Sequence, residues 1–351
     1  MSAALETPAA RPFMAAQGAA VLVILAIACL LVPAYASAWT IEAILLPFLA
    51  FSLAGLGLNL LTGYAGQVSL GSAAFMAVGA YAAYNFQLRL DLPLPLTFLF
   101  AALTAAAVGV IFGLPSLRLK GFYLAVSTLA AQFFIQWLFN KFGWFSNYSP
   151  SGVISAPVLG FAGITFDTRE SRYLLALSVV VVITFLVHRF VNGPARINLI
   201  AVRDNETAAR VIGVPVLRTK LTAFALSSAI IGIAGVLWSF TYLRTIEPEG
   251  FNLDRSFQIL FIAIIGGLAT VRGAFLGAGL IVVFPLLLSR GSAWILDGGL
   301  DAGTVQLTQR IILGATIIIF LILEPNGLSA ILDRITARTR SLFAKITRGR
   351  A

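Results

Sequence analysis

Residues 41–71 read IEAILLPFLAFSLAGLGLNLLTGYAGQVSLG, a long apolar run joined to a glycine-rich segment. The apolar part contains one charged residue, Glu42. As a helix it would extend about 30 Å, which is the thickness of the hydrocarbon core of a bilayer. The polar residues that follow are interrupted by Gly63, Gly66 and Gly71. This stretch therefore predicts a membrane-spanning helix that ends in a break of the helical backbone.

The composition of the whole chain indicates the same solvent. Of its 351 residues, 59% are hydrophobic and 11% are charged, whereas soluble domains carry about 25% charged residues. A chain with so few charges cannot cover the surface of a soluble core of this size, so much of its surface must face lipid. Because the apolar runs have the length of helical spans, we expect an all-α polytopic membrane protein.

Ten apolar segments are expected to enter the membrane, some of them discontinuous. Residues 72–84 form a short one directly after the glycine-rich segment, and 257–288 is too long for one ordinary span, so we interpret it as two. The first segment can also be read as a cleaved signal peptide, because Arg11 precedes it and Ala34-Tyr35-Ala36 has the form of a cleavage site. The segments are 18–32, 41–61, 72–84, 95–114, 122–139, 173–191, 221–243, two within 257–288, and 307–323.

The basic residues indicate the orientation of these segments. With both termini in the cytoplasm, 16 of the 24 Lys and Arg residues lie on the cytoplasmic side and 8 lie outside, as the positive-inside rule requires. The predicted parts are a cytoplasmic N-terminus at 1–17, a transmembrane domain at 18–324 with an outer loop at 141–172 and a cytoplasmic loop at 192–220, and a basic amphipathic cytoplasmic tail at 325–351.

Residue counts exclude several classes of function. His188 and Cys29 are the single histidine and cysteine, so neither a His/Cys metal site nor an intrachain disulfide can form. No G-x-x-x-x-G-K-[ST] phosphate loop occurs, so another chain must supply any nucleotide chemistry. The net charge of +10 lies beside the apolar runs and in the tail, which indicates contact with anionic lipid and not with nucleic acid. We expect no catalytic residue, no metal and no bound cofactor in this chain.

The two glycine-rich breaks are candidate parts of a translocation pathway. Backbone that leaves the helix at membrane depth must lie inside protein or line a wet cavity, and interrupted segments in both halves of a chain are typical of transporter pathways. The alternative is close helix packing through small residues, which includes Gly273-x-x-x-Gly277. The candidate pathway residues are Gly63, Tyr64, Gly66, Gln67, Ser69 and Gly71 in the first break and Gly266 and Gly267 in the second.

A short cytoplasmic helix is predicted within Arg203-Asp-Asn-Glu-Thr-Ala-Ala-Arg210. Asp204 or Asn205 would cap it, and Gly213 with Pro215 would end it. Such a helix either docks on a partner or is a solvated connector, and its residues alone leave both open.

Polar and aromatic residues near the ends of the spans suggest interfacial positions. Glu42 and Arg310 lie near the outer ends of their segments, where they would either pair with each other or extend to the interface. Trp238 and Tyr242 are expected in the interfacial aromatic belt, and Arg255 counts among the basic residues of the outer side.

Five motifs, in order along the chain, resemble the permease subunits of branched-chain amino acid ABC importers. They are GLNLLTGYAGQVSLG at 57–71, RLKGFYLA at 118–125, AVRDNETAARVIG at 201–213, IGGL at 265–268 and EPNGL at 324–328. The second motif resembles the M-type (LivM-like) of the two permeases that pair in this family. Close relatives in the family carry urea, short amides or other small acids, so the resemblance leaves the solute open.

The resemblance implies an ABC importer permease bundle in a bacterial cytoplasmic (inner) membrane. Its expected partners are a second permease, which we take to be a paralogous chain, two cytoplasmic ATPases that use ATP and Mg, and an extracytoplasmic substrate-binding protein. The ETAA sequence at 206–209 with Gly213 resembles the ATPase-coupling motif of importer permeases, which gives the short helix a docking role. The coupling residues implied are Arg203, Asp204, Asn205, Glu206, Ala208, Ala209 and Gly213.

Two other classes of membrane protein are weighed against this interpretation. An ion-driven secondary carrier would need buried acidic residues, and Glu42 is the single candidate within a predicted span. A membrane-embedded enzyme would need clustered His, Asp or Glu at membrane depth, which this sequence lacks.

Overall fold

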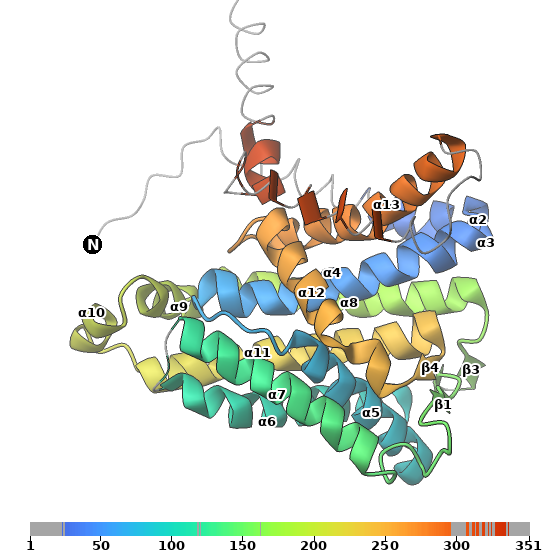
Figure 1. Ribbon diagram of the computed structural model, residues 1–351, viewed down its shortest axis with the longest axis horizontal. Helices are drawn as coiled ribbons and strands as arrows, with labels where there is room; N and C mark the ends of the chain where they lie inside the picture. The colour runs from blue at the N-terminus through green and yellow to red at the C-terminus, as the bar shows by residue number, and fades with distance from the viewer. Residues whose placement is uncertain are drawn as a thin grey trace, which may run out of the picture.

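The computed structural model describes residues 23, 25–117, 119, 121–161 and 163–295, together with 307–308, 311–312, 314–315, 318–319, 322, 324, 327–334 and 336. The expected N-terminal residues 1–17, the beginning of the first segment, parts of 307–323 and the end of the tail lie outside the described residues. What is described is a bundle of helices, with four strands of two residues each in the loops at one end (Figure 1).

The helices follow the predicted spans closely. The principal α-helices are α4 (Leu46–Asn59), α5 (Ser72–Leu90), α6 (Leu94–Gly113), α7 (Phe122–Lys141), α8 (Arg169–Val191), α9 (Ala195–Asp204), α10 (Glu206–Val211), α11 (Val216–Val236), α12 (Leu253–Gly266) and α13 (Val271–Ile295). Shorter α-helical and 3₁₀ pieces are α2 (Val32–Tyr35), α3 (Ala38–Thr40), η4 (Leu114–Leu117) and η6 (Pro248–Phe251). Four π-helical segments are η1 (Ile27–Leu31), η2 (Ile41–Leu45), η3 (Leu60–Tyr64) and η5 (Leu237–Leu243).

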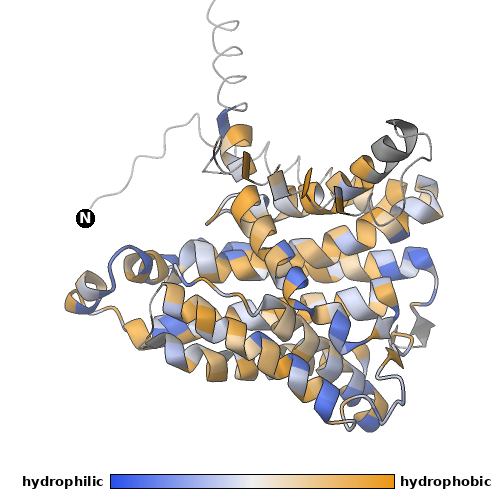
Figure 2. Ribbon diagram, in the orientation of Figure 1, coloured by the Kyte–Doolittle hydropathy of each residue, from blue (hydrophilic) through white to orange (hydrophobic). Residues whose placement is uncertain are grey.

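Six helices among the described residues are long and apolar enough to cross a membrane, so the chain is a multi-pass membrane protein. They are Ala38–Tyr64, Leu94–Gly113, Phe122–Lys141, Arg169–Val191, Val216–Leu243 and Val271–Leu288. Apolar residues colour the long helices along most of their length, and hydrophilic residues are frequent at the two ends of the bundle (Figure 2). The predicted all-α membrane fold is therefore confirmed, whereas the count of ten segments is not.

The core lies between the two longest spans and their neighbours. Nearly every residue of α4 is buried, and α11 packs against α4, α5 and α6. Small residues allow this packing: a Cβ atom added at Gly79 of α5 would overlap the backbone of Gly232 in α11. The bundle is thus built around close helix crossings in which one glycine faces another.

The short segment expected at 72–84 is in fact a helix of 19 residues, α5. Its last turns contain polar residues that hydropathy excluded from the span. Asn85 Nδ2 donates to the carbonyl of Tyr81 at 2.9 Å, and Arg89 Nε donates to Asn85 Oδ1 at 2.9 Å. Because these polar groups find partners in the protein, the helix continues through them.

Strands of two residues lie in the loops at the end of the bundle opposite α10 (Figure 1). β1 (Ile154–Ser155) pairs antiparallel with β4 (Thr245–Ile246), and β2 (Gly160–Phe161) pairs with β3 (Ile164–Thr165). The first pair joins the loop expected at 141–172 to the segment that follows η5. It is a small addition to an otherwise helical fold.

Glu42 pairs with Arg172, and the expected alternative partner Arg310 lies outside the described residues. Glu42 Oε1 accepts a hydrogen bond from Arg172 Nη2 at 3.0 Å, and Arg172 Nη1 donates to the carbonyl of Thr241 at 2.8 Å. Arg172 is buried, so Glu42 supplies the counter-charge that a buried guanidinium requires. The Glu42 side chain is itself 51% exposed, so the ion pair does not conflict with the expected position near the end of its segment.

Candidate functional site

The predicted cytoplasmic helix is α10, which projects with α9 at one end of the bundle (Figure 1). Asn205, and not Asp204, is its N-cap: Asn205 Oδ1 accepts from the backbone N–H groups of Thr207 and Ala208, both at 3.0 Å. Asp204 instead pairs with Arg203 Nε at 2.9 Å. After α10 the chain turns at Gly213, whose φ is +85°.

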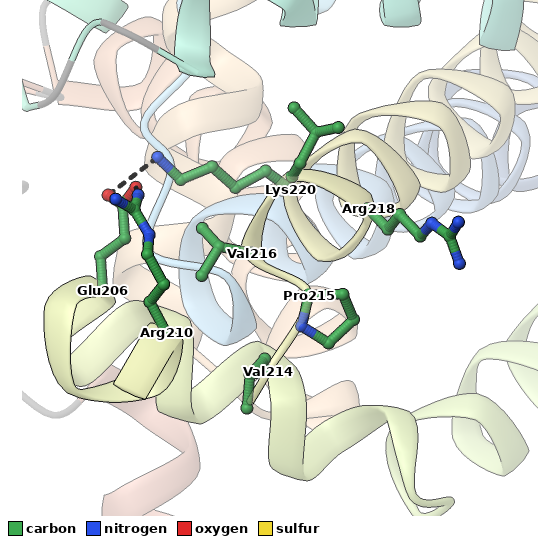
Figure 3. A pocket seen from close by; sticks show the side chains of 8 residues that line it. Glu206, Arg210, Val214, Pro215, Val216, Arg218 and Lys220 are labelled. Atoms are coloured by element: carbon green, nitrogen blue, oxygen red, sulfur yellow. Dashed lines mark hydrogen bonds and ion pairs between the residues drawn. The ribbon is translucent and has the colours of Figure 1, made fainter. Parts of the chain in front are cut away.

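Glu206 lies on the side of α10 that faces the bundle. Its Oε2 is 3.0 Å from Nζ of Lys220 in α11, and its Oε1 is 3.5 Å from Nη2 of Arg210. Figure 3 shows this cluster beside Val214, Pro215 and Val216. The Glu206 and Lys220 side chains are 12% and 7% exposed, so their ion pair fastens α10 to a membrane-spanning helix.

The outward side of α10 is formed by residues that sequence analysis did not select. Ala209 is buried against Val202 and Val216, whereas Val211 is 83% exposed and the following Ile212 is 74% exposed. Two adjacent apolar residues in a polar loop are the signal that could have identified this surface. Glu206 and Ala209 therefore position α10, and Val211 and Ile212 are its exposed apolar end.

The first glycine-rich break is non-helical from residue 65 to residue 71, as predicted. Gly66 has φ +68°, a conformation that glycine adopts without steric cost. Side chains of other helices satisfy the freed backbone: Leu70 N donates to Thr128 Oγ1 at 2.9 Å, and Ala74 N donates to Gln132 Oε1 at 2.6 Å. Most of the break thus packs against protein, where backbone polar groups can be paired, and Gly66 is its exposed residue.

Tyr64, Gln67 and Ser69 are all buried in this structure. Gln67 is 4% exposed, and neither its Nε2 nor its Oε1 has a hydrogen-bond partner among the described residues. A cavity of about 230 Å³ lies beside the break and reaches the loop before α10. Its lining residues are Ala65, Gly66, Gln67, Leu119, Gly121, Leu124, Val202, Arg203, Asp204, Asn205, Glu206 and Lys220.

Arg203 joins the two regions that sequence analysis treated separately. Its Nη1 donates to the carbonyl of Gly63 at 2.9 Å. A Cβ atom added at Gly66 would lie 2.6 Å from Arg203 Cγ, so the arginine side chain rests directly on the break. Arg203 lies two residues before Asn205, the N-cap of α10. Arg203 therefore connects the segment before α10 with Gly63 and Gly66 of the first break.

The second break lies next to the same span. Gly267 has φ +114°, and Asn59 of α4 holds the turn that follows it: Asn59 Oδ1 accepts from Ala269 N at 2.8 Å and Asn59 Nδ2 donates to the Thr270 carbonyl at 2.8 Å. The packing interpretation also finds support, because a Cβ atom at Gly266 would overlap the Gly273 carbonyl. Asn59, a lone amide in an apolar run, is a residue that sequence analysis missed.

Metal chemistry has no support in the described part of the chain. No group of three or more His, Cys, Asp or Glu side chains there is arranged to hold a metal ion.

Comparison with known proteins gives a consistent family. The profile described as "Branched-chain amino acid transport system / permease component" matches residues 40–321. The high-affinity branched-chain amino acid transport system permease protein LivM of Salmonella typhimurium is 30% identical over 305 residues, which are 79% of this chain and 67% of that protein. LivM of Escherichia coli is 29% identical over 301 residues, with the same shares.

A more distant relative extends the match beyond bacteria such as these. The probable branched-chain amino acid transport permease protein LivM of Methanocaldococcus jannaschii is 27% identical over 289 residues, or 71% of this chain and 81% of that protein. These relatives are named as transport permeases and not as enzymes. No solved structure matches the chain.

Proposed function

Since the chain belongs to the branched-chain amino acid transport permease family, we propose that it is the membrane-spanning subunit of an ATP-driven importer that moves branched-chain amino acids inward. The observation that carries the proposal is the family match over residues 40–321, which includes both helix breaks and α10. The chain itself is a permease and not an ATPase, in keeping with the absence of a phosphate loop from its sequence.

The partners follow from the family and from what the chain lacks. Two cytoplasmic ATPases would use ATP and Mg, a second and paralogous permease would complete the membrane part, and an extracytoplasmic binding protein would deliver the solute. The 16 to 8 distribution of basic residues supports ten segments with both termini in the cytoplasm of a bacterial inner membrane. The boundaries at 1–17, 18–324 and 325–351 belong to this proposal.

The ATPase would dock at α10, in the loop 192–220. The proposed coupling residues have separable tasks. Asn205 caps the helix, Glu206 and Ala209 hold it against the bundle, and Val211 and Ile212 present an apolar surface to the ATPase. Arg203 carries the displacement to the first break through its bond to the Gly63 carbonyl.

The solute would pass along the first break. The unpaired amide of Gln67 supports this role, because a buried polar group without a partner is costly and a passing polar solute would satisfy it. Enclosure of Tyr64, Gln67 and Ser69 is what a closed state of such a pathway would have. Gly71 is the N-cap residue of α5, and Gly266 and Gly267 shape the neighbouring second break.

Reconstitution tests the proposed function. The chain, its neighbouring permease and the ATPase pair are placed in liposomes with the binding protein, and uptake of radiolabelled leucine is measured. We expect uptake that requires both ATP on the ATPase side and the binding protein, and no ATP hydrolysis by the isolated chain. Uptake that persists without the ATPases and responds to a proton or sodium gradient would instead establish an ion-driven carrier.

A further inference from the structure

Arg255 lies in the first turn of α12 with its guanidinium group packed against two aromatic rings that contact each other. The guanidinium carbon is 4.3 Å from the ring centroid of Trp238 in η5 and 5.3 Å from that of Phe51 in α4. Nη1 donates to Gln258 Oε1 at 2.9 Å. Cation–π contacts and this hydrogen bond fix the side chain in one orientation.

Arg255 forms no ion pair with another described residue. No carboxylate of the described residues lies within 4.0 Å of Arg255, whereas the buried Arg172 pairs with Glu42 and the buried Lys220 pairs with Glu206. Arg255 is partly buried, and its Nε is sealed from solvent. An uncompensated cation in such surroundings is costly, and an ionisable group within a membrane protein that is not paired points to a functional site.

Further donors near the guanidinium group are also unused. Trp238 Nε1 and Arg255 Nε are both buried and have no hydrogen-bond partner among the described residues. The hydroxyl groups of Ser52 and Ser239, the sequence neighbours of Phe51 and Trp238, are buried and unpaired as well. A fixed cation with unused N–H donors is complementary to an anion, and the planar guanidinium group matches the geometry of a carboxylate.

The backbone around the cluster is unusual. Trp238 and Ser239 belong to η5, a π-helical segment of seven residues, and such segments occur frequently at functional sites. α12 begins near β4 and runs across the bundle toward α13 (Figure 1), and its other end is the second break, which Asn59 holds. A ligand at Arg255 would therefore contact a short helix, α12, that ends at the second break next to the proposed pathway.

We propose that Arg255 and Trp238 form a binding site for the carboxylate group of the transported solute within the membrane part of the permease. The proposal rests on the function proposed above, because a carboxylate is common to all amino acids. It makes Arg255 a residue that distinguishes acids from amines and amides of the same shape. Sequence analysis assigned Arg255 to orientation and Trp238 to the interfacial belt, and the structure buries Trp238 in the bundle instead.

The test measures tryptophan fluorescence of the assembled permease–ATPase complex in detergent, without the binding protein. Three probes separate the charged groups: leucine, 4-methylpentanoate, which lacks the ammonium group, and isoamylamine, which lacks the carboxylate. We expect a saturable change with the first two probes and none with isoamylamine. Arg255→Gln should weaken binding of both acids at least tenfold, Arg255→Lys should weaken it less, and Trp238→Phe should remove the signal.

The matched control is Arg244→Gln, which removes an exposed arginine that pairs with Asp167, and it should bind both acids as the wild type does. An equal response to isoamylamine, or unchanged acid binding by Arg255→Gln, would overturn the proposal. If Arg255→Gln does not assemble, Arg255→Lys and Trp238→Phe are used in its place. Weaker acid binding by Arg255→Lys and loss of the signal in Trp238→Phe would support the proposal, and unchanged acid binding by Arg255→Lys would overturn it. Absence of leucine uptake in the reconstituted wild type would contradict the proposed function, whereas 4-methylpentanoate binding that depends on Arg255 would still support the site.

Discussion

Glu206→Arg is expected to abolish solute uptake by the assembled importer while the permease still inserts into the membrane. The substitution places a third cation beside Lys220 and Arg210 and removes the carboxylate that pairs with both. Loss of one partner of a buried ion pair typically costs about 3–5 kcal/mol, so α10 should detach from α11. Uptake of leucine in proteoliposomes should fall below detection, with the amount of permease in the membrane unchanged.

A charge exchange distinguishes this explanation from a general loss of folding. The double variant Glu206→Lys with Lys220→Glu restores one opposite pair at the same place and should recover part of the uptake. The matched control is Glu170→Arg, the same substitution at a half-exposed position of the opposite end of the bundle, and it should transport normally. Uptake by Glu206→Arg at the wild-type rate would show that the pair does not position α10.

Gly66→Leu is expected to reduce uptake by at least about tenfold without preventing assembly. Two effects combine at this position. An L-residue at φ +68° costs roughly 1–2 kcal/mol, and the new side chain would occupy the space of Arg203 Cγ. The hydrogen bond between Arg203 and the Gly63 carbonyl should be lost, so that α10 is no longer connected to the first glycine-rich break. Substrate-stimulated ATPase activity should therefore fall together with uptake.

Gly152 provides a control that isolates the second effect. It also has a positive φ, +70°, but a Cβ atom added there would meet nothing within 4 Å. Gly152→Ala should therefore show the backbone strain alone and retain most uptake, whereas Gly66→Ala should already lose most of it. Equal behaviour of the two alanine variants would mean that contact with Arg203 is irrelevant to transport.

The sequence predicted the positions of the helix breaks and of α10 because their causes are local. Glycines end the helical geometry near residues 66 and 267, and a capping side chain followed by alanines begins α10. Such signals operate within a few residues of the chain, and the helix breaks and α10 both form where these signals stand.

Contacts between distant segments could not be predicted in this way. Arg203 and Gly63 are 140 positions apart, and no local pattern links them. The pairing of Glu42 with Arg172, which are 130 positions apart, could not be predicted for the same reason. Hydropathy indicates how deep a residue lies in the membrane but not the direction of its side chain. It therefore predicts Trp238 in the interfacial belt and Arg255 on the outer side, and it gives no sign that the two side chains contact each other.

The central claim is that ATP at the partner subunits changes the pathway at the first break through α10 and Arg203. The most direct measurement is the alkylation rate of a cysteine at position 67, Gln67→Cys, in a Cys29→Ala background, with a small water-soluble thiol reagent. The side chain at this position is enclosed in the present structure, so the account predicts slow reaction without nucleotide. It predicts a rate that changes by about tenfold when ATP is added, as a shift in conformational population would produce, and no such change when Arg203→Ala is also present. A cysteine that stays inert, or that reacts at one rate in every nucleotide state, would contradict the account.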